Sequence, residues 1–380
     1  MAHAKHFHSI ARCSDCTNIR PPGVRIYGTW SRLLIASALC IAGTIAPELG
    51  SRPAVAFPDR PIHLIVPYPP GGPNDVIARL LANRLDGDLG QRVIVENRGG
   101  GNASLGVIAA ARSAPDGHTI VLPGMPYAVN PSLFINVGYS FEQLAPVSIV
   151  TKGPLVLVVH PSLGVQSVQE LIALAKARPG KIDYGSGAKG TSLHLAAELF
   201  KQAAQVDLQQ IPYIGTNDLI PDMLTGRVPV VFLSPLIAKE HVAQARVLAL
   251  GVTSATRSPA WPNTPTIAEA GLPGYSMETW YAVLAPQGTP KDIVDKLSEA
   301  IAQGSSHPEV RGRLETLGNV PVGSTAAEVA AYIEAEAKRW HEILRSAGSR
   351  VSNLGAAARA ASASFKPPRR EVPLRLFDNE

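Results

Sequence analysis

Three glycine-rich turns of the chain have a composition suited to binding an anion through the backbone. They span 66–75, 96–104 and 184–192, and each lies between a predicted strand and a predicted helix. Glycine lets a backbone approach a ligand closely, and the first turn of a helix presents unpaired N–H groups with a partial positive charge. One such turn more often only joins a strand to a capped helix. Three turns at the carboxyl ends of strands, where α/β sheets bind ligands, favour a binding site.

The third turn also comes close to two nucleotide-binding motifs. Gly185, Gly187 and Gly190 match the dinucleotide fingerprint, but the next predicted strand, 208–213, ends without the acidic residue that would hold a ribose. The same glycines have the spacing of a phosphate-binding loop, yet Lys189 precedes the last glycine instead of following it. The sequence therefore predicts no cofactor.

The same turn offers one candidate nucleophile. Ser186 and Lys189 fit the serine/lysine pattern of penicillin-recognising enzymes, but no Lys-Thr-Gly or Ser-Asp-Asn follows them. We therefore expect a protein that is not an enzyme. A secreted serine hydrolase using Ser186 is the alternative.

Other chemically capable side chains have ordinary structural explanations. The histidines after residue 57 are scattered and show no paired ligand spacing, so no metal site is predicted. Asp75 lies in the first turn of a predicted helix, where the helix dipole stabilises a carboxylate, so capping alone explains it. The alternative role for Asp75 is to bind an ammonium group of a ligand. Trp280 and Tyr281 are either core residues or a pocket wall.

The elements that position these turns alternate along the chain as short β-branched runs and amphipathic helices. This pattern predicts an α/β fold with mixed, mostly parallel sheets. The predicted strands are 62–67, 92–96, 119–122, 147–150, 155–159, 208–213, 230–233 and 247–252. The predicted helices are 74–85, 103–112, 168–177, 192–202, 219–224, 291–303, 308–317 and 326–345.

Size and charge set further limits. A chain of 380 residues with 46% hydrophobic residues can bury a large core and is long enough for about two lobes. Lys and Arg are in excess only before residue 57 and from residue 350 onward, and the body between has 23 basic and 25 acidic residues. A nearly neutral body argues against nucleic acid as a partner.

The first 56 residues have the parts of a secretory signal peptide. An uncharged apolar run, 33–46, follows several arginines and precedes Ala54-Val55-Ala56. The run is shorter than a spanning helix requires, and we predict cleavage after Ala56 and export to the periplasm. Cys13, Cys16 and Cys40 all lie in this region, which leaves a body without thiols, as suits an oxidising compartment. The segment 349–380 lacks periodicity and is predicted to be a disordered tail.

Several long motifs, in order, resemble those of one family, the Bug-type periplasmic receptors of tripartite tricarboxylate transporters. The resemblance covers roughly residues 57–348. It rests on FPDRPIHLIVPYPPGGPND (57–75), LGQRVIVENRGGG (89–101), APDGHTIVL (114–122), NPSLF (130–134), YGSGAKGTSLHLAAELF (184–200), TSATRSPAWPNTPTIAEAGLPGY (253–275), APQGTPKDIVDKL (285–297) and HPEVRGRLETLG (307–318).

The resemblance implies a type II periplasmic binding protein, with two α/β lobes joined by two crossovers. Lobe one would comprise 57–123 plus 253–348, and lobe two 124–252. The implied function is capture of a small organic carboxylate for uptake or sensing. The implied partners are that ligand and the membrane subunits of a tripartite transporter, and we expect a monomer.

The resemblance also suggests which residues hold the ligand, mainly through backbone amides and small polar side chains of the first and third turns. The matching positions are Tyr68, Gly71, Gly72, Asp75, Ser186, Gly190, Thr191 and Ser192. The second turn departs from the family pattern, and Ser104 is kept there as a polar candidate. Tyr213-Ile214-Gly215-Thr216 and Pro229 also depart, by losing a lysine and an aspartate that are common in the family. These changes imply that this chain has a ligand preference of its own.

Overall fold

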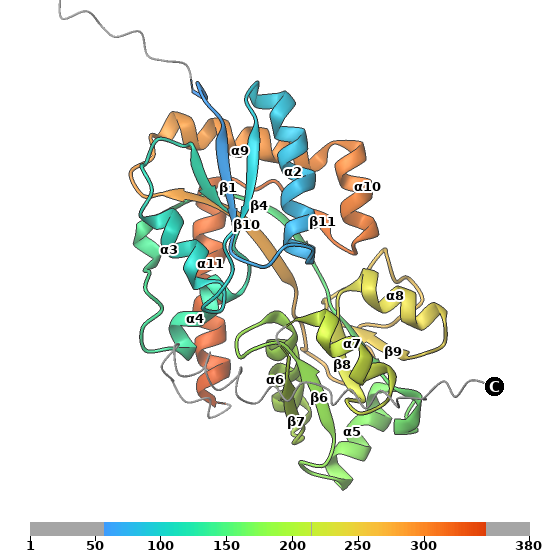
Figure 1. The fold of residues 1–380 in the computed structure, drawn as a ribbon. Helices are drawn as coiled ribbons and strands as arrows, with labels where there is room; N and C mark the ends of the chain where they lie inside the picture. Colours follow the sequence, from blue (N-terminus) through green and yellow to red (C-terminus); the bar gives the residue numbers. More distant parts are fainter. Residues whose placement is uncertain (1–56, 214, 347–380) are drawn as a thin grey trace, which may run out of the picture. The chain divides into compact units, whose positions relative to one another are not determined.

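Figure 1 shows the fold in a computed structural model that describes residues 57–213 and 215–346. The predicted signal peptide with its cleavage site after Ala56, the three cysteines and the predicted tail lie outside the described residues. Among the helices that are described, none is long and apolar enough to cross a membrane.

The described residues alternate strands and helices for most of their length, as predicted. The strands are β1 (Ile62–Val66), β2 (Val93–Asn97), β3 (Thr119–Val121), β4 (Leu144–Gly153), β5 (Val156–Val159), β6 (Asp183–Ser186), β7 (Gln209–Pro212), β8 (Val230–Leu233), β9 (Leu248–Val252), β10 (Thr279–Pro286) and β11 (Val320–Pro321). The helices are α2 (Pro73–Leu89), α3 (Ser104–Ala111), α4 (Pro126–Leu133), α5 (Val168–Ala177), α6 (Ser192–Ala204), α7 (Thr216–Leu224), α8 (Pro235–Ala243), α9 (Lys291–Ser306), α10 (Pro308–Thr316) and α11 (Ala326–Ser346).

These strands form two mixed sheets. The first has the order β11-β4-β10-β3-β1-β2 and the second the order β7-β6-β8-β5-β9. Strands β1, β2 and β3 are parallel, as are β6, β7 and β8, which fits the predicted βα units. Strands β4, β10 and β11 in the first sheet, and β5 in the second, run antiparallel to their neighbours. The predicted α/β fold class is confirmed.

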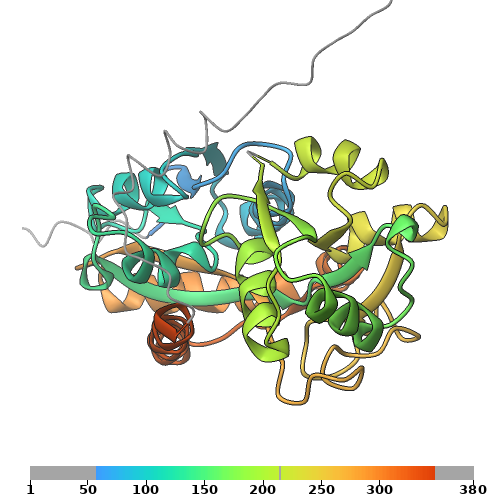
Figure 2. The same cartoon turned by 90° about the horizontal axis from the view of Figure 1, so that it is seen from below.

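Both sheets are covered on two faces, because alternate residues of their central strands enter different cores. In β1, Ile62 and Leu64 pack against α2, α9 and α10, whereas Ile65 enters the core that contains α3, α4 and α11. In β5, Leu157 enters this latter core and Val158 packs with α7 and α8. One face of each sheet therefore contributes to a continuous core. Helix α11 lies beside α4 (Figure 2).

The chain passes between the sheets at two adjacent points. The first crossing follows Gly153, at the end of β4, and the second precedes Thr279, at the start of β10. Thr279 pairs with Gly153, and its Oγ1 donates a hydrogen bond to the Gly153 carbonyl at 3.0 Å. The two sheets therefore divide the chain at other points than the lobe boundaries near 123 and 253 that the resemblance implies. Strand β4 belongs to the first sheet. The segment after β9 packs along the second sheet through the Val252–Thr266 bridge.

The strands and α-helices absent from the prediction are β10, the two-residue β11, α4 and α8. Strand β10 has no period-2 alternation, because most of it is buried on both faces. Helix α4 contains Pro131, and α8 is short and begins with Pro235. Trp280 is fully buried in the core. Tyr281, one residue later on the opposite face of the strand, lines a cavity. Of the two interpretations offered for this pair, core residue therefore holds for Trp280 and pocket wall for Tyr281.

Candidate functional site

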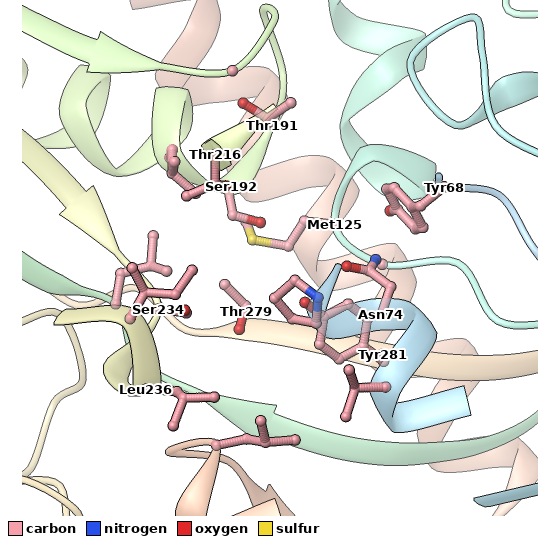
Figure 3. A pocket seen from close by; sticks show the side chains of 18 of the residues that line it. Tyr68, Asn74, Met125, Thr191, Ser192, Thr216, Ser234, Leu236, Thr279 and Tyr281 are labelled. Atoms are coloured by element: carbon pink, nitrogen blue, oxygen red, sulfur yellow. The ribbon is translucent and has the colours of Figure 1, made fainter. Parts of the chain in front are cut away.

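A cavity of about 410 Å³ lies where the ends of both sheets meet (Figure 3). This volume is in the range of small-molecule binding sites. It is lined from the side of the first sheet by Tyr68, Gly71, Pro73, Asn74, Val76, Gly124, Met125, Pro126, Thr279, Tyr281, Leu317 and Asn319. It is lined from the second by Pro154, Leu155, Gly187, Thr191, Ser192, Leu193, Gly215, Thr216, Asn217, Leu219, Ser234, Pro235, Leu236 and Ile237. None of these lining side chains is charged.

Five helices begin at the cavity wall: α2, α4, α6, α7 and α8. None of the five has a side-chain hydrogen bond at its N-cap. Because the N-terminus of a helix carries a partial positive charge, their convergence favours an anion in the cavity without any lysine or arginine in the wall. Helices α3, α9 and α10 also lack a side-chain cap, but they begin away from the cavity. The feature that distinguishes this site is therefore that several helix N-termini meet at it, and not that their caps are missing.

The start of α6 offers the clearest set of free donors. Thr191, its N-cap, uses its hydroxyl to donate to the Ala188 carbonyl at 2.8 Å. The backbone N–H groups of Ser192 and Leu193 have no acceptor among the described residues. No acidic residue lies in the first turn of this helix. These two N–H groups are therefore available to a carboxylate.

The first glycine-rich turn is arranged differently, because it already holds a carboxylate of the protein. Asp75 is 5% exposed and accepts hydrogen bonds from Gly71 N, Asn97 Nδ2 and Arg79 Nε, each at 3.0 Å. Burial opposes ionisation, but these hydrogen bonds outweigh it and lower the pKa of Asp75. Asp75 therefore fixes the turn as an anion and does not line the cavity. Gly72 is the N-cap of α2 and likewise is not among the lining residues.

Neutral donors line the cavity next to this turn. Burial, reinforced by the neighbouring Tyr281, raises the pKa of Tyr68, although hydrogen bonds from the Gly124 backbone and the Asn74 side chain oppose the rise. Burial likewise raises the pKa of Tyr281 to about 12. Both phenols are therefore protonated at neutral pH and can donate to a ligand.

The second glycine-rich turn supports the site without lining it. Asn102 and Ala103 adopt left-handed backbone conformations, with φ of 53° and 71°. Asn102 Nδ2 donates to the Lys189 carbonyl at 2.8 Å and to Asn130 Oδ1 at 2.7 Å, which joins the second turn to the third. Ser104 is 1% exposed and lies within hydrogen-bonding distance of Asn130 Nδ2, at 3.3 Å.

Ser186 has the contacts of a structural residue. It is fully buried, donates to the Gly187 carbonyl at 3.0 Å and accepts from Gln210 Nε2 at 2.9 Å. Among the described residues no histidine or lysine contacts its hydroxyl, and Lys189 is exposed to solvent. The geometry needed to activate this serine is not present in the described part of the chain.

Gly190 lies behind the cavity wall. Its φ is +86°, and its N–H donates to Nδ1 of the buried His194 at 3.3 Å. Its amide is therefore committed to the protein, contrary to the expectation that it would bind the ligand. Burial, partly opposed by Glu198, lowers the pKa of His194 to about 4, so at neutral pH the ring is neutral and Nδ1 can accept this hydrogen bond.

The structure thus brings four of the nine predicted residues to the cavity: Tyr68, Gly71, Thr191 and Ser192. Gly72, Asp75, Ser104, Ser186 and Gly190 hold the turns from behind. Sequence reasoning missed Asn74, Met125, Thr216, Ser234 and Thr279, and it offered Tyr281 only as one of two residues that could form a pocket wall. A strand followed by Ser-Pro or Gly-Thr is a helix-start signal, which could have identified Ser234 and Thr216. Among the described residues, no group of three or more metal-ligating side chains is present.

Comparison with known proteins identifies the family of this chain. A profile of the tripartite tricarboxylate transporter family receptor matches residues 77–349. BugT of Bordetella pertussis is 37% identical over 326 residues, which cover 84% of this chain and 99% of BugT. Among solved structures, R. palustris Rpa4515 with adipate is 34% identical with a TM-score of 0.72, covering 77% of this chain and 98% of that protein. The periplasmic binding protein BugD is 31% identical with a TM-score of 0.70, covering 78% of this chain and all of BugD. The chain belongs to the tripartite tricarboxylate transporter receptor family.

Proposed function

We propose that this protein is a periplasmic solute-binding receptor that captures a small organic carboxylate and presents it to the membrane subunits of a tripartite transporter. The observation that supports this most strongly is the cavity where five helix N-termini converge on a wall without charged side chains. Such a wall stabilises an anion through fixed backbone dipoles, which need little reordering when the ligand binds. The adipate bound to a relative is consistent with a carboxylate ligand.

The carboxylate is bound by the first turn of α6, and Thr216 and the start of α7 contribute from the neighbouring loop. Ser192 N and Leu193 N supply two donors fixed by the helix, and the Ser192 hydroxyl supplies a third. Charge-assisted hydrogen bonds of this kind are about twice as strong as neutral ones. Ionised acids therefore bind, and their methyl esters do not.

The two sheets with their helices act as two lobes that close on the ligand. By sheet membership, lobe one is 57–153 plus 279–346 and lobe two is 154–278, apart from residue 214. The crossings at Gly153 and Thr279 are adjacent, and short paired segments of this kind serve as hinges in binding proteins. A decrease in the radius of gyration by small-angle scattering when ligand saturates the protein tests this closure.

Export depends on the N-terminal segment. We propose cleavage after Ala56, so that the mature protein begins at Phe57 and functions in the periplasm as a monomer. N-terminal sequencing of periplasmic material tests the cleavage site, and a first residue before Cys40 would contradict it. Size-exclusion chromatography with light scattering tests the monomer.

The decisive experiment is calorimetric titration of the mature protein with organic acids and their methyl esters. We expect saturable binding of acids, no binding of esters and no conversion of bound ligand. An ester that binds as tightly as its acid would refute the anion site. Covalent labelling of Ser186 by an acylating reagent, detected by mass spectrometry, would support a hydrolase instead.

A further inference from the structure

Two helices from different lobes touch beside the cavity, at the end of α10 and the start of α8. Gly318 follows the last turn of α10, Pro235 is the first residue of α8, and both are buried. Helix α10 packs in the core of the first sheet through Leu314, and α8 packs in a separate core of the second sheet through Ala238. In Figure 1, α10 (orange) lies above α8 (yellow). The contact therefore lies where the lobes have separate cores, whereas α4 and α6 share one.

Gly318 has an ordinary structural reason to be glycine. Its φ is +80°, a conformation that favours glycine, and its N–H donates to the Glu315 carbonyl at 2.9 Å. The next N–H, of Asn319, donates to the Leu314 carbonyl at 2.8 Å, which completes a Schellman motif at the end of α10. Gly90 ends α2 in the same lobe with a φ of +69°. The left-handed backbone alone does not distinguish these two glycines.

The two glycines differ in the space around them. A Cβ at Gly90 would meet no atom within 4 Å. A Cβ at Gly318 would lie under 3.0 Å from both Cβ and Cγ of Pro235, closer than side-chain atoms pack. These atoms belong to a proline ring at the first position of a helix, so they cannot rotate away as the end of a flexible side chain can. Relief of such a clash would require α8 and the end of α10 to separate.

Separation at this point would change the cavity, because residues on both sides of the contact line it. The lining residues next to Pro235 and Gly318 are Ser234, Leu236, Ile237, Leu317 and Asn319. The first turn of α8 contains no acidic residue, and the N–H groups of Leu236 and Ile237 have no acceptor among the described residues. Contact with α10 thus holds a helix N-terminus with free donors at the wall of the anion site.

The loop 317–319, between α10 and β11, also packs against the first crossing between the sheets. A Cβ at Gly153, the last residue of β4, would lie 2.5 Å from Asn319 Oδ1 and 2.8 Å from the Gly318 carbonyl oxygen. Gly153 in turn pairs with Thr279 at the second crossing. The loop therefore fills the space between the hinge and the start of α8, and a change in the angle between the lobes changes its contact with Pro235.

We infer that Gly318 is a positioning residue for the ligand, because the absence of a side chain there lets α8 close onto the end of α10 and complete the cavity wall. This inference rests on the proposed function, in which the lobes close on a carboxylate. Gly318 does not itself line the cavity. A side chain at this position would oppose the closed state, so part of the binding free energy of a ligand would be spent on the clash.

Gly318→Ala and Gly90→Ala form a matched pair, because each places a Cβ on a left-handed backbone at the end of a helix in lobe one. Calorimetry at neutral pH with adipate, succinate, benzoate and citrate identifies the acid that the unmodified protein binds most tightly, and both variants are titrated with it. We expect at least about tenfold weaker binding by Gly318→Ala, the factor that corresponds to overpacking, and less than about a twofold change in Gly90→Ala. Equal affinities of the two variants overturn the inference and leave the proposed function standing. If the unmodified protein binds none of these acids, both are overturned.

Small-angle scattering tests whether the added methyl group opposes closure. With each protein saturated by the same acid, the radius of gyration should decrease equally in the unmodified protein and in Gly90→Ala, and less in Gly318→Ala. A full decrease in Gly318→Ala would show that its side chain does not keep the lobes apart, and would overturn the inference.

Removal of the proline ring should relieve the clash. Gly318→Ala should weaken binding by less than about threefold when it is added to Pro235→Gly, which lacks the ring atoms. Pro235→Ala keeps the nearest atom, Cβ, and should not relieve the clash. Equal losses from Gly318→Ala in the unmodified and Pro235→Gly backgrounds would overturn the inference. Thermal unfolding checks that each variant is folded. If Gly318→Ala is not, recovery of folding in the double variant supports the contact, and failure to recover overturns it.

Discussion

The first and third glycine-rich turns look alike in sequence but differ in the charge that the protein itself places beside them. Both follow a parallel strand, contain a glycine with positive φ and open a helix at the cavity. The first turn gives its Gly71 amide to Asp75, an anion of the protein itself. The third bonds its Gly190 amide to the neutral ring of His194, and the first turn of its helix contains no acidic residue. In both turns, the N–H groups that open the helix have no acceptor among the described residues. A glycine-rich turn at a helix start is therefore open to an external anion only if the protein places no carboxylate of its own there.

The largest expected effect comes from removing one donor at α6. Ser192→Pro deletes the Ser192 N–H at the first helical position, where proline is tolerated, and Thr191 already has the extended backbone that precedes proline. We expect a loss of affinity of about 1.5 to 3 kcal/mol, the range for a hydrogen bond to a charged group. Calorimetry with the best acid measures it.

Ser192→Ala is the control for that substitution, since it removes the hydroxyl and keeps the N–H. It should cost less than the proline. If the two variants bind equally well, the backbone donor is not used and the comparison between the turns fails.

The second effect is on stability and tests His194 as the internal acceptor of the third turn. The pKa of His194, about 4, lies below its usual 6.5, so between these values the unfolded chain binds more protons and the free energy of unfolding falls as the pH is lowered. For this residue the loss between pH 6.5 and 4.5 is about 2 kcal/mol. His194→Asn, which keeps an acceptor near Nδ1, should lack this contribution in urea titrations across the same range. If the free energy of unfolding of His194→Asn falls with pH as steeply as that of the unmodified protein, His194 does not make this contribution.

The third effect compares the two glycines directly. A Cβ at Gly71 would meet no atom within 4 Å, whereas at Gly190 it would lie 2.7 Å from Leu133 Cδ1 and 3.0 Å from Asn102 Nδ2. Gly71→Ala should cost about 1 kcal/mol of stability from the left-handed backbone alone. Gly190→Ala should cost about 1 to 2 kcal/mol more because of overpacking. Chemical denaturation of both variants gives the difference, and equal costs would show that the third turn is not constrained by α4.

The smallest effect is expected at Lys189, the cation nearest the free donors in sequence. Its side chain is exposed, and within residues 57–213 and 215–346 only its carbonyl is hydrogen-bonded, by Asn102. Lys189→Ala should change affinity by less than about 0.5 kcal/mol, as is typical of an exposed charge. Loss of binding in this variant would show that a cation, and not the backbone, holds the ligand.

The sequence by itself determined the fold class, the family and most of the regular elements. Local patterns are sufficient for these features: buried strands such as Ile62–Val66 read as β-branched apolar runs, and α11 reads as an amphipathic repeat. The family resemblance was recognised from long motifs, several of which contain the three turns. Strand β10 escaped detection because its residues are buried from both sides by segments distant in the chain, which no local pattern records.

Only the tertiary structure decided which of the candidate residues reach the cavity. Asp75, Ser104, Ser186 and Gly190 have the right types and spacing, but their partners Arg79, Asn130, Gln210 and His194 take up their polar groups. Conversely, Ser234 and Thr279 line the cavity because α8 and β10 begin there, far along the chain from the three turns. The physical reason is that availability to a ligand depends on which hydrogen bonds are still unmade, and these are known only once the elements have packed.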